Sequence, residues 1–210
     1  MRSIKFSQAI LEATDYCLGN DSSVFIIGLG VPDPKGIFGT TLGLQKKYGE
    51  DRVMDMPLSE NCMTGVVIGA ALNSFKPILI HQRVEFALLS IDQIVNQAAK
   101  WNYMNAGQKS VPIVIRMIIG RGWGQGSQHA QSLESWFSHI PGLKVVMPAT
   151  PYDAKGLLIS SIEDNNPVIF LEHRWLHNLV DDVPIEGFKV PIGKARIART
   201  GKHVTIVSHS

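Results

Sequence analysis

The stretch Val53-Met54-Asp55-Met56-Pro57-Leu58-Ser59-Glu60 passes from an apolar strand through a proline turn into a helix of small residues. A carboxylate at such a junction is expected at the carboxyl edge of a sheet, where open α/β folds bind their ligands. Glu60 also has a simpler interpretation, because a glutamate in the first helical turn gains roughly 0.3–1 kcal/mol from the helix dipole. Local rules favour this helix-starting role, and a catalytic role stays open.

Apolar strands and helical patterns alternate outward from this stretch in both directions. The predicted strands are residues 24–27, 53–56, 77–80, 112–119, 143–146 and 168–171. The predicted helices are residues 7–18, 40–48, 59–73, 90–104, 132–139 and 152–163. This alternation predicts an α/β fold, in which a parallel sheet carries helices on both faces.

The pattern changes after Glu172, where residues 173–190 are irregular in sequence. Residues 195–198 and 204–207 resemble two further strands. We therefore expect one domain over residues 1–188, followed at 189–210 by a linker and the first strands of a second domain that is cut short.

The composition of the 210 residues is that of an ordinary globular protein, with 45% hydrophobic and 18% charged residues. The net charge of +2 without a basic run gives no support for a nucleic-acid partner. No apolar run reaches the roughly 20 residues of a membrane span. Two cysteines without a metal-ligand pattern, and a start without the apolar core of a signal peptide, predict a cytoplasmic location.

Two glycine-rich segments follow predicted strands, but neither has the spacing of a nucleotide-binding loop. In residues 120–126 the Gly-x-Gly-x-x-Gly pattern is not completed, and no Gly-Lys-Ser/Thr follows for a P-loop. In Gly28-Leu29-Gly30 the place of the third glycine is taken by Asp33. A nicotinamide-dependent dehydrogenase is therefore a distant alternative, and residues 120–126 are either a flexible loop over a site or a plain long turn.

Histidines near this loop are the other candidates for chemistry. His129 is placed to act as a general acid or a substrate ligand, although spacing alone favours a solvent-facing histidine. His173 and His177 are four residues apart, but a metal pair is not expected without a carboxylate or cysteine set.

Taken together, the segments resemble a known family. Eight of them occur in family order, among them Pro57-Leu58-Ser59-Glu60 and Gln128-His129-Ala130-Gln131. The others lie at residues 43–49, 91–100, 111–116, 141–146, 153–157 and 164–168. The chain is similar to the beta subunit of the decarboxylating component of 2-oxo acid dehydrogenase complexes, such as the pyruvate and branched-chain enzymes. The resemblance implies a transketolase-like pyrimidine-binding domain.

The resemblance also implies a cofactor and partners. Thiamine diphosphate would lie between this domain and a separate alpha subunit. The family's Gly-Asp-Gly motif for diphosphate and magnesium is absent here, so magnesium would be held mainly by that alpha subunit. A second beta subunit would complete a heterotetramer, and a lipoyl-bearing acyltransferase would accept the acyl group of the 2-oxo acid. The chain alone would be inactive.

Site residues follow from the same resemblance. Glu60 would hydrogen-bond N1′ of the aminopyrimidine and favour its 4′-imino tautomer, with Leu58 also at the cofactor. Phe86 would pack on the pyrimidine ring, and His129 would stand near the substrate end. A structural potassium ion would be held largely by backbone carbonyls, a ligand type suited to a hard cation. Its residues would be Ile113, Ser161, Asp164 and Asn166.

Two departures from the family pattern leave alternatives open. Leu29 stands where the family commonly has an acidic residue, and the segment before Phe86 is unusually polar, with Arg83 and Glu85. The alternatives are a diverged thiamine enzyme that acts on another 2-oxo acid or passes its acyl group elsewhere, and a non-catalytic scaffold subunit.

Overall fold

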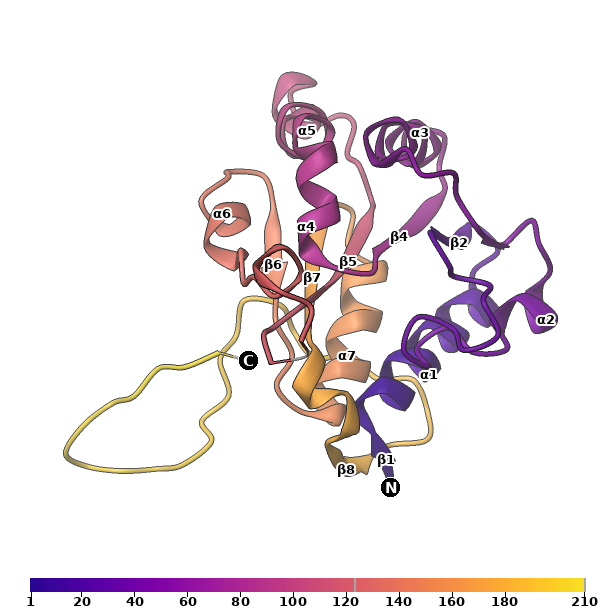
Figure 1. Cartoon of the computed structure of the whole chain (residues 1–210). Helices are drawn as coiled ribbons and strands as arrows, with labels where there is room; N and C mark the ends of the chain where they lie inside the picture. The colour runs from indigo at the N-terminus through magenta and orange to yellow at the C-terminus, as the bar shows by residue number, and fades with distance from the viewer. Residues whose placement is uncertain (123, 210) are drawn as a thin grey trace.

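The computed structural model of the chain describes residues 1–122 and 124–209 and is built on a six-stranded, fully parallel sheet (Figure 1). The strand order is β3-β2-β4-β5-β7-β6. The strands are β2 (Val24–Gly28), β3 (Val53–Met54), β4 (Lys76–His81), β5 (Val114–Ile119), β6 (Lys144–Val146) and β7 (Val168–His173). The predicted α/β class and parallel sheet are confirmed.

Helices cover both faces of this sheet. The main helices are α1 (Phe6–Asn20), α3 (Glu60–Leu72), α5 (Ala99–Met104) and α7 (Pro151–Ile162). Shorter ones are α2 (Leu44–Tyr48), α4 (Val84–Ala87) and α6 (Glu134–Ser138). Figure 1 shows α1 and α7 on one side of the sheet and α3 and α5 on the other. No helix in the described part of the chain is long and apolar enough to span a membrane.

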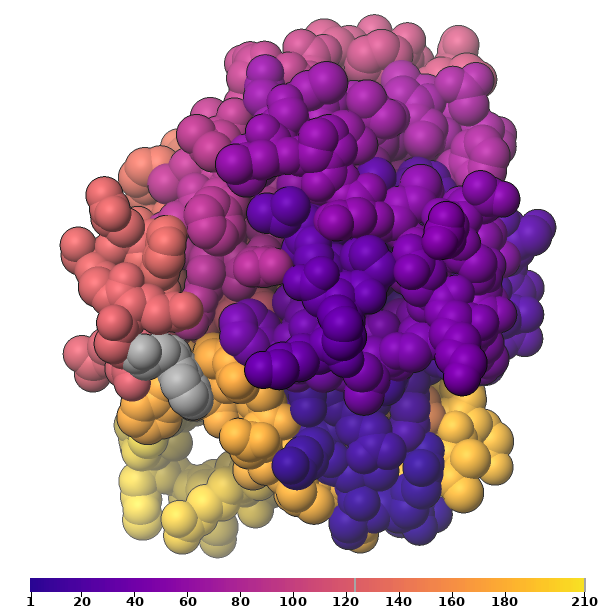
Figure 2. Space-filling model, turned by 45° about the vertical axis from the view of Figure 1, so that its right-hand side comes forward, coloured from indigo at the N-terminus to yellow at the C-terminus, as the bar shows by residue number. Residues whose placement is uncertain are grey.

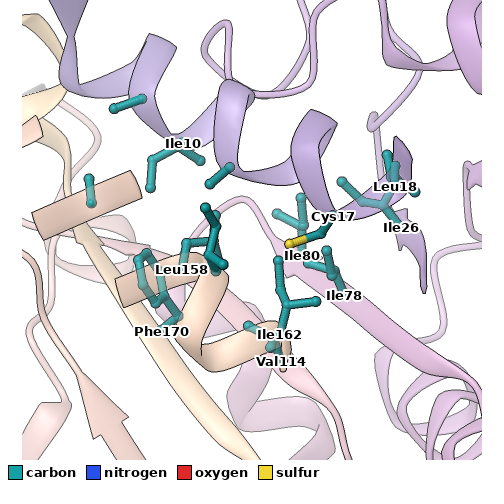
Figure 3. Close-up of a cluster of buried hydrophobic side chains, with 14 of the residues drawn as sticks. Ile10, Cys17, Leu18, Ile26, Ile78, Ile80, Val114, Leu158, Ile162 and Phe170 are labelled. Carbon is teal, nitrogen blue, oxygen red and sulfur yellow. The ribbon is translucent and has the colours of Figure 1, made fainter. Parts of the chain in front are cut away.

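The alternation of side chains along each strand divides the interior into two cores. Ile26, Ile80 and Phe170 face α1 and α7, where Cys17 and Leu158 pack against them (Figure 3). Their neighbours along these strands, Ile27, Leu79 and Leu171, enter the second core, beneath α3, α4 and α6. Burial on both faces explains why the strands are continuous apolar runs in the sequence.

The predicted helix over 90–104 is divided in the structure. A 3₁₀ turn, η1 (Leu88–Ser90), precedes a π-helical segment, η2 (Gln93–Ala98), which leads into α5. The predicted helix over 40–48 is shorter, because Gly43 has φ +76° and α2 begins only after it. A left-handed residue cannot continue a right-handed helix.

Two short strands were not predicted. β1 (Arg2–Lys5) pairs antiparallel with β8 (Val180–Val183), which joins the start of the chain to the segment after β7. A further 3₁₀ segment, η4 (Arg174–Asn178), lies between β7 and β8. Residues 173–190 are thus more regular than the sequence suggested.

The strands predicted at 195–198 and 204–207 are absent, since residues 191–209 form neither helix nor strand. The yellow C-terminal segment projects from the body in Figure 2. A strand is stable only when a neighbour completes its hydrogen bonds, and no described segment lies beside these residues as a strand. The proposed domain division at residue 188 stays a prediction.

Candidate active site

The strand order places a topological switch point at the carboxyl edge of the sheet between β2 and β4. The chain leaves β2 toward β3 on one side and leaves β4 toward β5 on the other, and such switch points are where open α/β sheets bind ligands. The loops after the two strands meet there, because Gln82 Nε2 donates a hydrogen bond of 2.9 Å to the Leu29 carbonyl.

Glu60 begins α3 at this edge and is buried, with 6% of its surface exposed. Its backbone carbonyl accepts a hydrogen bond from Thr64 Oγ1. Among the described residues, however, its carboxylate has no hydrogen-bond or ion-pair partner. The carboxylate can therefore accept a hydrogen bond from a ligand at this edge of the sheet.

This geometry is compatible with both interpretations of Glu60. Partial burial strengthens the interaction of a carboxylate with the helix dipole, and a carboxylate without a partner among the described residues is also available to a ligand. The pyrimidine N1′ of thiamine, when it carries a proton, is a donor of the kind that the carboxylate lacks. The residue therefore fits that cofactor.

An acidic group that the sequence analysis missed stands beside Leu29. Asp55 Oδ1 accepts hydrogen bonds of 2.9 Å from the backbone N–H of Gly30 and from that of Met56. The carboxylate thus reaches the loop after β2 from the end of the neighbouring strand β3. Its position near the end of the strand predicted over residues 53–56 was the signal that could have identified it.

Phe86 and His129 meet at the other side of this edge. Phe86 lies on α4 after β4, and His129 ends the 3₁₀ turn η3 (Ser127–His129) that follows β5. Their ring centroids are 5.2 Å apart with the planes tilted by 57°. Leu58 lies in the loop before Glu60 and is 74% exposed, so its side chain faces away from the protein interior.

The tautomer of His129 follows from its backbone neighbour. Nδ1 lies 2.5 Å from the Gln128 carbonyl, which can only accept a hydrogen bond. We therefore place the proton on Nδ1, which leaves Nε2 to exchange a proton with a ligand.

The glycine-rich segment 120–126 lies over this region, although Trp123 is outside the described residues. Gly120 packs on the ring of His173 and Gly122 on that of Trp175, so that an added Cβ would lie 2.8 Å from either ring. The segment is a loop beside the candidate site and not a nucleotide-binding turn.

The two histidines four residues apart do not form a metal pair. His177 is buried with Nε2 3.5 Å from Glu172 Oε2, whereas His173 packs beneath Gly120. Burial lowers the pKa of His173, with the charge of Glu134 acting in the opposite direction. No group of three His, Cys, Asp or Glu side chains in the described ranges is arranged for a metal ion.

The four residues implied for potassium lie together at the amino edge of the sheet, away from Glu60. The Ile113 carbonyl accepts from Val168 N–H at 2.9 Å, and Asn166 N–H donates to Asp164 Oδ1 at 2.9 Å. Ser161 accepts from Asp164 N–H through its carbonyl. The second oxygen of the Asp164 carboxylate forms an ion pair with Lys144.

Comparison with known proteins agrees with this fold. Residues 2–178 match the family described as transketolase, pyrimidine binding domain, and the chain belongs to that family. A solved split-gene transketolase, described as an inactive beta4 tetramer, superposes with a TM-score of 0.63. At 16% identity over 81% of this chain and 51% of that one, it supports the fold alone.

Curated relatives are more similar in sequence. The pyruvate dehydrogenase E1 component subunit beta of Gracilaria tenuistipitata is 45% identical over all of this chain and 65% of its own length. The acetoin:2,6-dichlorophenolindophenol oxidoreductase subunit beta of Cupriavidus necator is 44% identical over 99% of this chain and 64% of its own. The mitochondrial pyruvate dehydrogenase E1 subunit beta of Bos taurus is 44% identical over 97% and 58%. The chain thus spans about 60% of the length of these relatives.

Proposed function

We propose that this chain supplies the pyrimidine-binding half of the active site in the beta subunit of a thiamine-diphosphate-dependent 2-oxo acid dehydrogenase. The observation that carries the proposal is the buried residue Glu60, whose carboxylate has no partner among the described residues, in a domain of the pyrimidine-binding family. The relatives named as pyruvate dehydrogenase beta subunits support the reaction class.

Each site residue then has a distinct task. Thiamine diphosphate, when bound, supplies the electron sink for decarboxylation of a 2-oxo acid. Glu60 holds a proton at N1′, and Phe86 offers its ring as a packing surface. His129 exchanges a proton through Nε2 at the substrate end.

The remaining parts of the site are proposed on a partner chain. The described residues provide no carboxylate cluster for a divalent cation, and the sequence lacks the diphosphate motif. An alpha subunit would provide both, in an assembly of two alpha and two beta subunits. A lipoyl-bearing acyltransferase is the proposed acyl acceptor.

The test is the substitution Glu60→Gln in the full-length protein combined with its alpha subunit. We expect decarboxylation of 2-oxo acids to fall by about 10²-fold or more, in the range found when an acid–base group is removed. The thermal midpoint should not fall, because a buried unpaired charge is removed. Glu50→Gln is the matched control, since Glu50 is exposed to solvent. Full activity of Glu60→Gln would refute the proposed role.

A second candidate function is a diverged thiamine enzyme with another substrate. The acetoin relative is nearly as similar as the pyruvate one, and the turn before Phe86 carries Arg83 and Glu85. Comparing pyruvate, branched-chain 2-oxo acids and acetoin in the same assembled enzyme separates these candidates. A scaffold subunit is the third possibility, and it predicts no saturable binding of thiamine diphosphate in calorimetry of the assembled pair.

A structural potassium ion is a separate part of the proposal. The Lys144 ammonium already neutralises Asp164, and the backbone carbonyls of Ile113 and Ser161 already accept hydrogen bonds. A bound potassium ion predicts a higher thermal midpoint in potassium chloride than in sodium chloride. Equal midpoints would remove this ion from the proposal.

A further inference from the structure

We propose that Arg83 and Glu85 are positioning residues that hold the loop 120–131 in place and thereby keep His129 against Phe86. Arg83 directly precedes the short helix α4, which follows β4 and carries Glu85 and Phe86. For its effect on catalysis the proposal rests on the proposed function, whereas the loop geometry can be tested without turnover.

Arg83 holds the first part of the loop, residues 120–125. Its side chain is buried, with 4% of the residue exposed, although it carries a full charge. Nη1 donates to the Gly120 carbonyl at 3.4 Å, and Nη2 donates a short hydrogen bond to Gln125 Oε1. The guanidinium fork therefore joins the first residue of the loop to a residue five positions further along.

Glu85 holds the end of the loop, at Gln131. Its Oε1 accepts a hydrogen bond of 2.7 Å from the backbone N–H of Gln131, two residues after His129. A carboxylate that accepts from a backbone N–H makes a charge-assisted bond, which is stronger than a neutral one. His129 thus lies between two anchor points, one at Gln125 and one at Gln131.

The loop requires such anchors because its own backbone is permissive. Gly120, Gly122, Gly124 and Gly126 all have positive φ, between +67° and +107°. Glycine populates many other conformations at similar energy, so the sequence alone does not hold this path. Within the loop, the base is closed by a bond of 3.3 Å from Gly120 N–H to the Gln131 carbonyl.

The two anchors also balance each other in charge. Burial lowers the pKa of the Arg83 guanidinium, the nearby Glu85 charge opposes that change, and Arg174 adds to it. Each anchor therefore makes the burial of the other less costly. Removing either Arg83 or Glu85 is therefore expected to loosen both ends of the loop 120–131.

The test compares Arg83→Gln and Glu85→Ala with the native full-length protein by NMR of histidine Cε1–H groups, with His129 assigned from His129→Asn. In the native protein the Phe86 ring shifts the His129 signal, because the rings are 5.2 Å apart. We expect this shift to be lost in both variants. In the enzyme assembled with its alpha subunit, kcat should fall about 10-fold or more, with the Kd for thiamine diphosphate unchanged, since misplacing a group by 1 Å can cost about 10²-fold.

Two further variants separate positioning from general stability. Arg52→Gln removes an arginine that likewise binds backbone carbonyls, those of Leu18, Asp21 and Val24, outside the loop 120–131. It should lower the thermal midpoint but leave the His129 signal in place. Glu85→Gln keeps an oxygen acceptor for Gln131 and should restore most of the signal and rate.

An unchanged His129 signal in Arg83→Gln and Glu85→Ala would overturn the proposal. If the assembled enzyme decarboxylates no 2-oxo acid, the proposed function fails, but the NMR comparison still decides whether the two residues hold the loop.

Discussion

At the scale of single residues, Arg116 and Glu172 form an ion pair in the interior of the sheet, with Arg116 Nε 2.6 Å from Glu172 Oε1. Both side chains are almost fully buried, and His177 approaches the other carboxylate oxygen. The two remaining nitrogens of the guanidinium have no partner among the described residues. The pair therefore depends on its one charge-assisted bond. Removing either charge leaves the other buried without a counter-charge.

The pH dependence of stability follows from this pair. Burial alone would raise the pKa of Glu172, but Arg116 and His177 outweigh it and hold the pKa at about 2, below its usual 4.5. A depressed carboxyl pKa contributes stability that is present above pH 4.5 and is lost as the pH falls toward 2. Glu172→Gln should cost roughly 3–5 kcal/mol at neutral pH, because Arg116 is left unpaired. Urea unfolding at several pH values measures both effects.

His81 provides the internal comparison for that experiment. Burial lowers its pKa to about 4, so its contribution to stability is lost as the pH falls from 6.5 toward 4. In Glu172→Gln, the stability should still decline between pH 6.5 and 4, because His81 is unchanged. The decline between pH 4.5 and 2 should disappear. The double variant Arg116→Met with Glu172→Leu should recover much of the stability, and an equally unstable double variant would contradict the ion-pair argument.

Glu60 shows how far residue-level prediction reaches. Local rules favoured a helix-starting charge, and only the set of motifs in order pointed to a cofactor. Burial and the absence of a partner for a carboxylate are properties of the folded chain, since they depend on side chains from distant segments. For the same reason the hydrogen bond from the Gly30 N–H to the Asp55 carboxylate could not be read from either loop alone.

At the scale of elements, the turn before β6 approaches α5 so closely that only glycine fits. Gly142 has φ +101°, and an added Cβ would lie 1.9 Å from the carbonyl oxygen of Ala99, the first residue of α5. Lys100 Nζ donates to the neighbouring Pro141 carbonyl at 2.7 Å and fixes the turn against the helix.

Gly142→Ala should therefore destabilise the protein by roughly 2–5 kcal/mol, from left-handed strain and from displacement of the α5 backbone. Gly107→Ala is the matched control, because Gly107 has φ +77° but open space around the added Cβ. Its cost should be about 1–2 kcal/mol, the strain alone. Urea midpoints of the two variants measure the difference, and equal midpoints would show that the turn moves away freely.

The same scale shows which elements the sequence could predict. The buried strands were identified because parallel strands covered on both faces are continuous apolar runs. β1 was missed because only Ile4 of its four residues is buried, and its partner β8 lies at the far end of the chain. Residues 195–198 and 204–207 have strand-like composition, but composition does not supply the neighbouring strand that they require.

At the scale of the whole molecule, one lysine joins three distant parts of the chain. Lys155 on α7 is 2% exposed, and its ammonium donates to the carbonyls of Pro184 and Ile185 at 2.7 and 2.8 Å. It also lies 3.3 Å from Glu12 Oε2 on α1. The segment after β8 is therefore fastened to the helices that cover one face of the sheet, next to the β1–β8 pair.

Lys155→Met should remove this fastening with little change in side-chain volume. Two backbone carbonyls and a carboxylate lose a donor, which should cost roughly 2–4 kcal/mol in unfolding free energy. The backbone amides of β1 and β8 should exchange with deuterium faster, because the segment that continues β8 is no longer held. Lys100→Met, which removes an exposed ammonium from a single carbonyl, should change the free energy by less than about 1 kcal/mol.

If the two variants are equally stable and exchange in β1 and β8 is unchanged, the antiparallel pair holds the ends of the domain without Lys155. If Lys155→Met is less stable while the Phe86-to-His129 ring shift is kept, the fastening on the α1 and α7 face is independent of the geometry at the carboxyl edge.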